Sequence, residues 1–187
     1  MAIEYTFKEF IEDLEAITSA SLDAEVITRR AAPFLEKLCG NAEAIPAEYR
    51  TAPVGQRGRY ILHRGPRFTV TSVIWRPGDE ARSHDHETWG LVGVVKNEIQ
   101  ETRYVSKGTR SLGGKVALEV REVFRHTRGA VSRLVPPHDE IHAMHNPTSK
   151  DTLEIHVYGK DLMGLQRHVF DADGTVKSLV SGKYMNC

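Results

Sequence analysis

The sequence predicts a mainly β domain, an antiparallel sandwich or barrel, preceded by α-helices. A chain of 187 residues fits one domain or one domain with a helical extension, and a hydrophobic fraction of 40% is enough for a core. Apolar residues recur at helical spacing over residues 1–40, whereas many short runs of β-forming residues, separated by turn residues, occupy 57–187. Many strands with little helix between them are typical of an antiparallel sandwich or barrel.

Two amphipathic helices are predicted within residues 1–40. Their apolar stripes recur at spacings of three and four and consist of Phe7, Phe10, Ile11, Leu14 and Ile17 in the first helix and of Val26, Ile27, Ala31, Leu35 and Leu38 in the second. Ser21 or Asp23 would cap the second helix, and Gly40 would end it. Pro33 lies inside this segment, so we expect a kink or a division there.

Residues 41–56 are predicted to connect the helices to the strands. The run 68–75 is rich in β-branched and aromatic residues and stops just before Pro77, as strands that lead into a turn do. By the same criteria, further strands are predicted at 57–64, 82–86, 89–95, 98–105, 116–124, 131–135, 141–145, 152–158, 165–170 and 175–180. We therefore divide the chain into a helical segment (1–45) packed on a β-barrel (46–187), the two forming one folded unit.

The composition argues against several classes of partner. Lys+Arg and Asp+Glu both number 25, so the formal net charge is +0 and gives no electrostatic case for nucleic acid or a membrane surface. No apolar run approaches the roughly 20 residues of a membrane span, and the first residues do not resemble a secretory signal. Cys39 and Cys187 form neither a disulfide framework nor a zinc motif. We expect a cytoplasmic protein with reduced thiols.

The most informative feature is a pair of histidines one residue apart, His84 and His86, in the segment SHDHETWG. On a β-strand alternate side chains point to the same face, so these imidazoles should project together while Asp85 turns away. A second segment, DEIHAMHN, offers a third imidazole from another strand, either His142 or His145, which would face opposite sides. Three imidazoles directed at one point would form a metal site.

The spacing around these histidines resembles the paired motifs of the cupin superfamily, whose members form a small jelly-roll β-barrel around a metal. Gly78 stands six residues before His84. Pro137 stands five residues before His142 and Asn146 four residues after it, which favours His142 as the third ligand. The cupin pattern also has a glutamate four or five residues after the second histidine, where this chain has glycine and leucine, so the ligand set lacks a carboxylate.

Within that superfamily, the segments HDHETWGLVGVV, IHAMHN, LEIHVYG and LQRHVFD resemble, in the same order, the thiol dioxygenases of the cysteine dioxygenase family, and most of all the bacterial 3-mercaptopropionate branch. The resemblance implies Fe(II) held by His84, His86 and His142. Three neutral imidazoles would leave the charge of the ion uncompensated, so a bound thiol would lose its proton readily. Imidazole alone does not select iron, so the identity of the metal is implied by the resemblance only.

The resemblance further implies that the protein oxidises a small carboxylated thiol (3-mercaptopropionate, cysteine or mercaptosuccinate) with O2 to its sulfinic acid. No redox partner would be needed, because the thiol supplies all the electrons. Two alternatives remain open: a cupin module that binds a metal or a small acid without turnover, and another cupin enzyme such as a quercetinase-like dioxygenase or a sugar isomerase. The sequence is compatible with a monomer or a small homo-oligomer.

Alternation places Glu154, His156 and Tyr158 on one face of a predicted strand. In the resembled family a Ser-His-Tyr row at this spacing lies beside the iron, where the tyrosine contacts substrate or oxygen and the histidine orients it. Here the glutamate could accept the imidazole N–H and make His156 more basic. The alternative interpretation is a half-exposed polar strand face. The cysteine that some members crosslink to this tyrosine corresponds to Gly93, so we expect no crosslink to Tyr158.

Two arginines are candidate anchors for a substrate carboxylate, which a guanidinium binds in a bidentate manner. Arg59 matches the carboxylate-binding arginine of cysteine-type members, and Arg167 matches the arginine that mercaptopropionate-type members use instead. The presence of both predicts a pocket with more positive charge than either type requires, which would suit a thiol dicarboxylate. Alternatively, one arginine pairs with Glu154 or another acid, either is a solvated surface residue, or Arg57 takes the place of Arg59.

Overall fold

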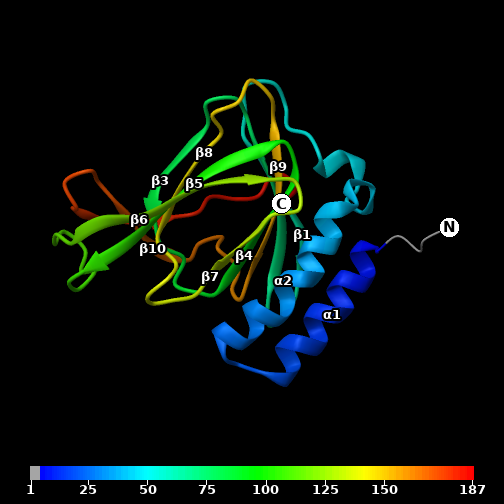
Figure 1. Cartoon of the computed structure of the whole chain (residues 1–187), viewed down its shortest axis with the longest axis horizontal. Coiled ribbons are helices and arrows are strands. Elements are labelled where there is room, and N and C mark those ends of the chain that lie inside the picture. Colours follow the sequence, from blue (N-terminus) through cyan, green and yellow to red (C-terminus); the bar gives the residue numbers. More distant parts are fainter. Residues whose placement is uncertain (1–4) are drawn as a thin grey trace.

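The computed structural model describes residues 5–187, which contain two α-helices, two short 3₁₀-helices and eleven strands (Figure 1). Helix α1 (Phe7–Ala20) begins with a capping box between Thr6 and Glu9. Helix α2 (Ala24–Gly40) is capped by the carboxylate of Asp23, one of the two caps that the sequence allowed. None of the helices in this part of the chain has the length and apolarity needed to cross a bilayer.

Helix α2 continues through Pro33 as one element. Ala31 and Leu35, on either side of the proline, are fully buried in the cluster that joins the helices to a sheet. Burial of this face stabilises both halves of the helix and offsets the backbone hydrogen bond that proline cannot make. Of the two expectations, the division at Pro33 was therefore wrong, and the kink stays a prediction.

The strands pair antiparallel throughout and form two sheets, with the orders β1-β2-β9-β4-β7 and β11-β10-β3-β8-β5-β6. Their positions agree with the predicted ones to within a few residues. The elements after α2 are η1 (Ala42–Ala44), η2 (Ala47–Tyr49), β1 (Gly58–Arg64), β2 (Thr69–Trp75), β3 (Glu80–His84), β4 (Gly90–Lys96), β5 (Glu98–Lys107), β6 (Ala117–Thr127), β7 (Val131–Leu134), β8 (His142–His145), β9 (Thr152–Tyr158), β10 (Gln166–Phe170) and β11 (Val176–Val180).

The two helices lie side by side, and α2 packs against strands β4 and β7 of the five-stranded sheet (Figure 1). The residues of β9 that face the helices, Ile155 and Val157, pack in one apolar cluster with Leu35 and Leu38 of α2. The alternate residues of β9 face the other sheet and are polar. The predicted fold class is confirmed: the chain is mainly β, with two antiparallel sheets that face each other as in a jelly-roll barrel and with N-terminal α-helices.

Residues 182–187 lie along strand β1, which is an edge strand of its sheet. The N–H of Met185 donates to the carbonyl of Arg59 at 2.8 Å. The side chain of Asn186 accepts the N–H of Ile61 at 3.0 Å and donates to its carbonyl at 2.9 Å. These bonds cover part of the open edge and fix the last residues of the chain next to β1.

Leu35 provides a test of the helix-to-sheet packing. It is fully buried, and it lies so close to β4 that a Cβ at Gly93 would be 2.9 Å from its Cγ. Replacing Leu35 with alanine should lower the free energy of unfolding by about 3 kcal/mol, because the change removes apolar contacts and leaves a cavity. Leu22→Ala, at a position that is 94% exposed, should change it by less than about 0.5 kcal/mol. Urea denaturation measures both, and equal effects would contradict the packing described here.

Candidate metal centre

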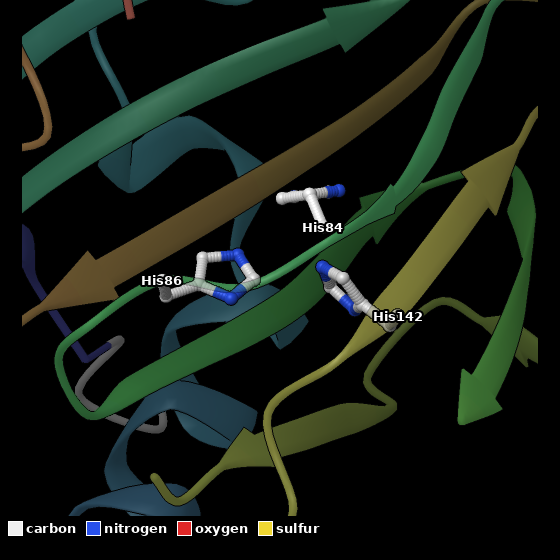
Figure 2. Close-up of side chains that lie close together, drawn as sticks. All are labelled: His84, His86 and His142. Carbon is white, nitrogen blue, oxygen red and sulfur yellow. The ribbon is translucent and has the colours of Figure 1, made fainter. Parts of the chain in front are cut away.

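Three histidine side chains converge in the interior between the two sheets (Figure 2). His84 is the last residue of β3 and His142 the first of β8, and the two are register partners, so their side chains leave the sheet on the same face. His86 lies two residues beyond the end of β3, and its ring turns towards the same space. One ring nitrogen of each lies within 4.8 Å of the others. The structure thus brings the predicted trio together.

The backbone around His86 differs from the prediction. The strand expected at 82–86 ends at His84, and residues 85–87 are irregular. Glu87 has a φ of 54°, in the left-handed region, which is incompatible with a continuing strand. The alternation argument therefore predicted that the two rings converge, but it was wrong about the backbone that brings them there.

A buried carboxylate holds this irregular segment. Glu140 accepts the backbone N–H of His86 at 3.0 Å and that of Glu87 at 3.1 Å. Burial raises the pKa of Glu140, an effect that its hydrogen bonds from Arg110 and from the backbone of His86 oppose. Asp85 turns away from the trio, is fully buried and pairs with the same arginine at 3.1 Å. The position of His86 thus depends on residues that are distant in the sequence.

The three rings present their Nε2 atoms to the shared space. Each Nδ1 faces an oxygen: His84 the carbonyl of Arg82 (2.8 Å), His86 the carbonyl of Glu140 (3.2 Å), and His142 the carboxylate of Glu101 (2.6 Å). These oxygens can only accept, so Nδ1 carries the proton and Nε2 keeps a free lone pair. Burial lowers the pKa of His84 and His86 well below the usual range, which keeps both rings neutral. The buried Nε2 of His86 has no hydrogen-bond partner within residues 5–187, as a metal ligand requires.

Glu101, on β5, is the functional residue that sequence reasoning missed. Its Oε1 accepts from Nδ1 of His142 at 2.6 Å and lies 2.7 Å from Nε of Arg103 in an ion pair. Its Oε2 lies 2.7 Å from both Nε2 of His126 and the hydroxyl of Ser132. Burial alone would raise the pKa of Glu101, but these partners hold it well below its usual range. An ionised carboxylate behind His142 fixes the ring and makes it a better metal ligand.

The ring of Tyr158 occupies the space beside Gly90, one of the two positions at which the resembled sequence pattern has a glutamate. Gly90 is the register partner of Tyr158, and a Cβ at Gly90 would lie 2.8 Å from Cδ1 of that ring. Leu91 points the other way, into the cluster beneath the helices. Gly93 also faces the helices, where a Cβ would lie 2.6 Å from Sγ of Cys39. The correspondence of Gly93 with the crosslinking cysteine was therefore wrong, since Gly90 is the residue opposite Tyr158.

Glu154, His156 and Tyr158 form a hydrogen-bonded row on the inward face of β9. Nδ1 of His156 lies 2.9 Å from the Tyr158 hydroxyl, and its Nε2 lies 3.0 Å from Oε2 of Glu154, which also accepts the indole N–H of Trp75 at 2.6 Å. The ring of Tyr158 stacks on His86 with centroids 5.3 Å apart. Burial raises the pKa of Tyr158, so its hydroxyl keeps the proton. The row is buried, which contradicts a half-exposed strand face.

A cavity of about 300 Å³ lies between the sheets, beside the trio and the row. Arg59 and Arg167 both line it, the first half-buried and the second buried, so neither is a solvated surface residue. Arg57 lines it as well but pairs with Asp79 at 3.2 Å. Within residues 5–187, Glu154 makes its side-chain hydrogen bonds to a tryptophan and a histidine rather than to an arginine.

The other candidate groups lie outside this cavity. His145 faces the opposite side of β8 from His142. His168, Asp85 and Glu87 form a second group of atoms within 4.8 Å of one another, but Asp85 in this group already pairs with an arginine and accepts from His168 at 2.8 Å. The thiol of Cys39 is buried, which raises its pKa to about 12 and excludes a thiolate at neutral pH.

Comparison with known proteins gives low similarities. No protein-family model matches the sequence. A cupin superfamily protein from Desulfitobacterium hafniense is 13% identical over 65% of this chain and 89% of that chain, with a TM-score of 0.44. A conserved protein with a double-stranded β-helix domain from Klebsiella pneumoniae is 16% identical over 73% and 93%, with a TM-score of 0.44. An oxalate oxidase is 17% identical over 50% and 42%, with a TM-score of 0.35. Similarity at this level says nothing about activity, and the antiparallel strand pairing alone defines the fold.

Glu101→Gln tests the role of the carboxylate behind His142. The variant should bind a divalent metal about 10- to 100-fold more weakly, because an amide lacks the charge that orients and polarises the ring. Calorimetric titration with Co²⁺ measures the affinity. Glu98→Gln is the matched control, since this glutamate is on the same strand and pairs with the exposed Arg125. Equal affinities of Glu101→Gln and the wild type would contradict the proposed orientation of His142.

Proposed function

We propose that this protein is an iron-dependent dioxygenase that converts a small carboxylated thiol into its sulfinic acid. One observation carries the proposal: three convergent imidazoles without a carboxylate ligand share a cavity with a buried tyrosine and with arginines. An all-imidazole ligand set leaves the charge of a divalent cation uncompensated, which favours an anionic thiolate as the substrate group. Ferrous iron held by His84, His86 and His142 would supply the redox-active centre at which the thiol and O2 meet.

Arg167 is well placed to hold a substrate carboxylate. A guanidinium keeps its charge when it is buried and presents parallel donors that match a carboxylate. Arg167 lies on β10, and the residue two positions later, Val169, is the register partner of His84. A carboxylate held by Arg167 would therefore leave the thiol of a short substrate beside the histidine trio. Such positioning lowers the entropic part of the reaction barrier.

The row on β9 would hold a proton at the Tyr158 oxygen. Because the carboxylate of Glu154 can accept but not donate, Nε2 of His156 carries a proton. Nδ1 of the same ring would then accept the hydroxyl proton of Tyr158. The lone pairs of the tyrosine oxygen are left to accept a hydrogen bond from the substrate. In the overall reaction, R–SH + O2 → R–SO2H, the thiol is oxidised, O2 is reduced, and no other reductant is consumed.

Oxygen consumption tests the proposed activity directly. Protein reconstituted with ferrous iron should consume O2 with at least one of 3-mercaptopropionate, cysteine and mercaptosuccinate. Mass spectrometry of the product should show the addition of two oxygen atoms. Bound iron with no oxygen consumption on any of the three thiols would contradict the proposal and favour a module that binds without turnover. Zinc or nickel held tightly through gentle purification would favour another kind of cupin enzyme.

Tyr158→Phe tests the contribution of the row. The variant should retain iron, because Tyr158 contributes none of the three convergent ring nitrogens. Its kcat should fall about 100-fold, because the hydroxyl that holds the proton is gone. Iron content by elemental analysis and initial rates of oxygen consumption measure the two effects. Tyr104→Phe, at a half-buried tyrosine in another part of the barrel, should leave kcat unchanged. An unchanged kcat in Tyr158→Phe would remove the row from the mechanism.

A further inference from the structure

The cavity carries more positive charge than one substrate carboxylate requires. Among residues 5–187, four arginines line it and no aspartate or glutamate does. Two of the four pair with carboxylates that lie outside the lining, at 3.2 Å and 2.9 Å. The other two, Arg59 and Arg167, have only neutral hydrogen-bond partners in the part of the chain that the structure describes.

Arg167 is a buried cation whose protein partners orient it without balancing its charge. Its Nη1 donates to the carbonyl of Asp85 at 2.9 Å, and its Nη2 donates to the hydroxyl of Ser181 at 2.5 Å. Its Nε is buried and has no partner within residues 5–187. Burying a cation without a counter-ion costs free energy. An anion in the cavity would supply both the missing charge and a further acceptor.

Arg59 is held in a similar way. Its Nη2 donates to the carbonyl of Gly182 at 2.5 Å, and the guanidinium lies over the ring of Tyr184, 4.5 Å from its centroid. Its Nε is also buried without a partner in the described part of the chain. The carbonyl and the aromatic face stabilise the guanidinium but do not neutralise it.

The C-terminal segment brings the two guanidinium groups close together. Ser181 and Gly182, which hold Arg167 and Arg59 respectively, are consecutive residues, so their Cα atoms are about 3.8 Å apart. Burial lowers the pKa of Arg167, and Arg59 is among the charges that add to this effect, as expected for two cations that repel each other. Two like charges held close together attract negative charge more strongly than either does alone.

We propose that Arg59 and Arg167 bind the two carboxylates of one substrate molecule, so that the substrate class is a short thiol dicarboxylate of the size of mercaptosuccinate. This inference rests on the proposed function, because it identifies the substrate of the same site. Each guanidinium can bind one carboxylate through parallel hydrogen bonds. The consecutive anchoring residues and a cavity of only about 300 Å³ limit the two carboxylates to a separation of a few carbon atoms.

Binding of two acids without a thiol tests the inference independently of turnover. The iron-loaded, full-length protein under argon should bind succinate at least about ten times more tightly than butyrate, as measured by calorimetry. Butyrate has the same number of carbon atoms but only one carboxylate. Equal affinities for the two acids would overturn the inference.

Arginine variants identify which charges produce the preference. In Arg59→Gln and in Arg167→Gln the ratio of succinate to butyrate affinity should fall close to one, because only one of the two proposed carboxylate anchors remains. Arg82→Gln is the matched control, since it removes an exposed arginine that lines the cavity but pairs with Asp171. Circular dichroism checks that each variant is folded. If Arg167→Gln does not fold, Arg59→Gln still tests the inference, because Arg59 is only half-buried. An unchanged ratio in Arg59→Gln, or an equal loss in Arg82→Gln, would overturn the inference.

Turnover separates this inference from the proposed function. Wild-type kcat/KM should be about tenfold higher with mercaptosuccinate than with 3-mercaptopropionate, and Arg59→Gln should remove the difference. Oxidation of 3-mercaptopropionate without preference for the dicarboxylate would overturn the substrate assignment and leave the dioxygenase proposal standing. Tight, Arg59-dependent succinate binding without oxygen consumption on any thiol would support the dicarboxylate site and contradict the dioxygenase proposal.

Discussion

Hydrogen bonds to the Nδ1 atoms of His84, His86 and His142 set the geometry of the site. Two backbone carbonyls and the carboxylate of Glu101 accept these bonds, and each bond selects the tautomer that directs Nε2 into the cavity. The register between β3 and β8 aligns two of the rings, whereas the third depends on Glu140. Without such partners the three imidazoles would be free to rotate, and their convergence would be lost.

Strand β9 connects the apolar core to the polar interior. Strand β9 packs Ile155 and Val157 under the helices, and its opposite face carries His156 and Tyr158, which line the cavity, so one element belongs to both the core and the site. The apolar contacts on its outer face stabilise a strand whose inner face buries ionisable groups. The lack of a side chain at position 90 of β4 lets the tyrosine ring reach the trio. The helices therefore support the site although they do not line the cavity.

Local patterns predicted the strands and the convergence of His84 and His86, because alternation and turn residues act over a few positions. The choice of His142 over His145 came from the spacing of the resembled motif. The end of β3 at His84 was not predictable, because a distant carboxylate, Glu140, holds the residues that follow. Glu101 was missed, although a signal existed: Ile99, Glu101 and Arg103 alternate on one buried face of a predicted strand. Strand register decides which charged side chains pair, and the spacing of residues in the sequence does not reveal that register. The domain boundary, the oligomeric state and the cytoplasmic location stay predictions.

The Nε2 atoms of the three histidines should together bind one divalent iron. Anaerobic titration of the metal-free protein with Fe²⁺, followed by gel filtration and elemental analysis, measures this most directly. The wild type should retain one iron per chain, and His86→Ala almost none. The matched variant His145→Ala, at a histidine that faces away from the trio, should retain a full equivalent. A wild-type protein that does not retain iron, or a His86→Ala variant that retains it fully, would contradict the account.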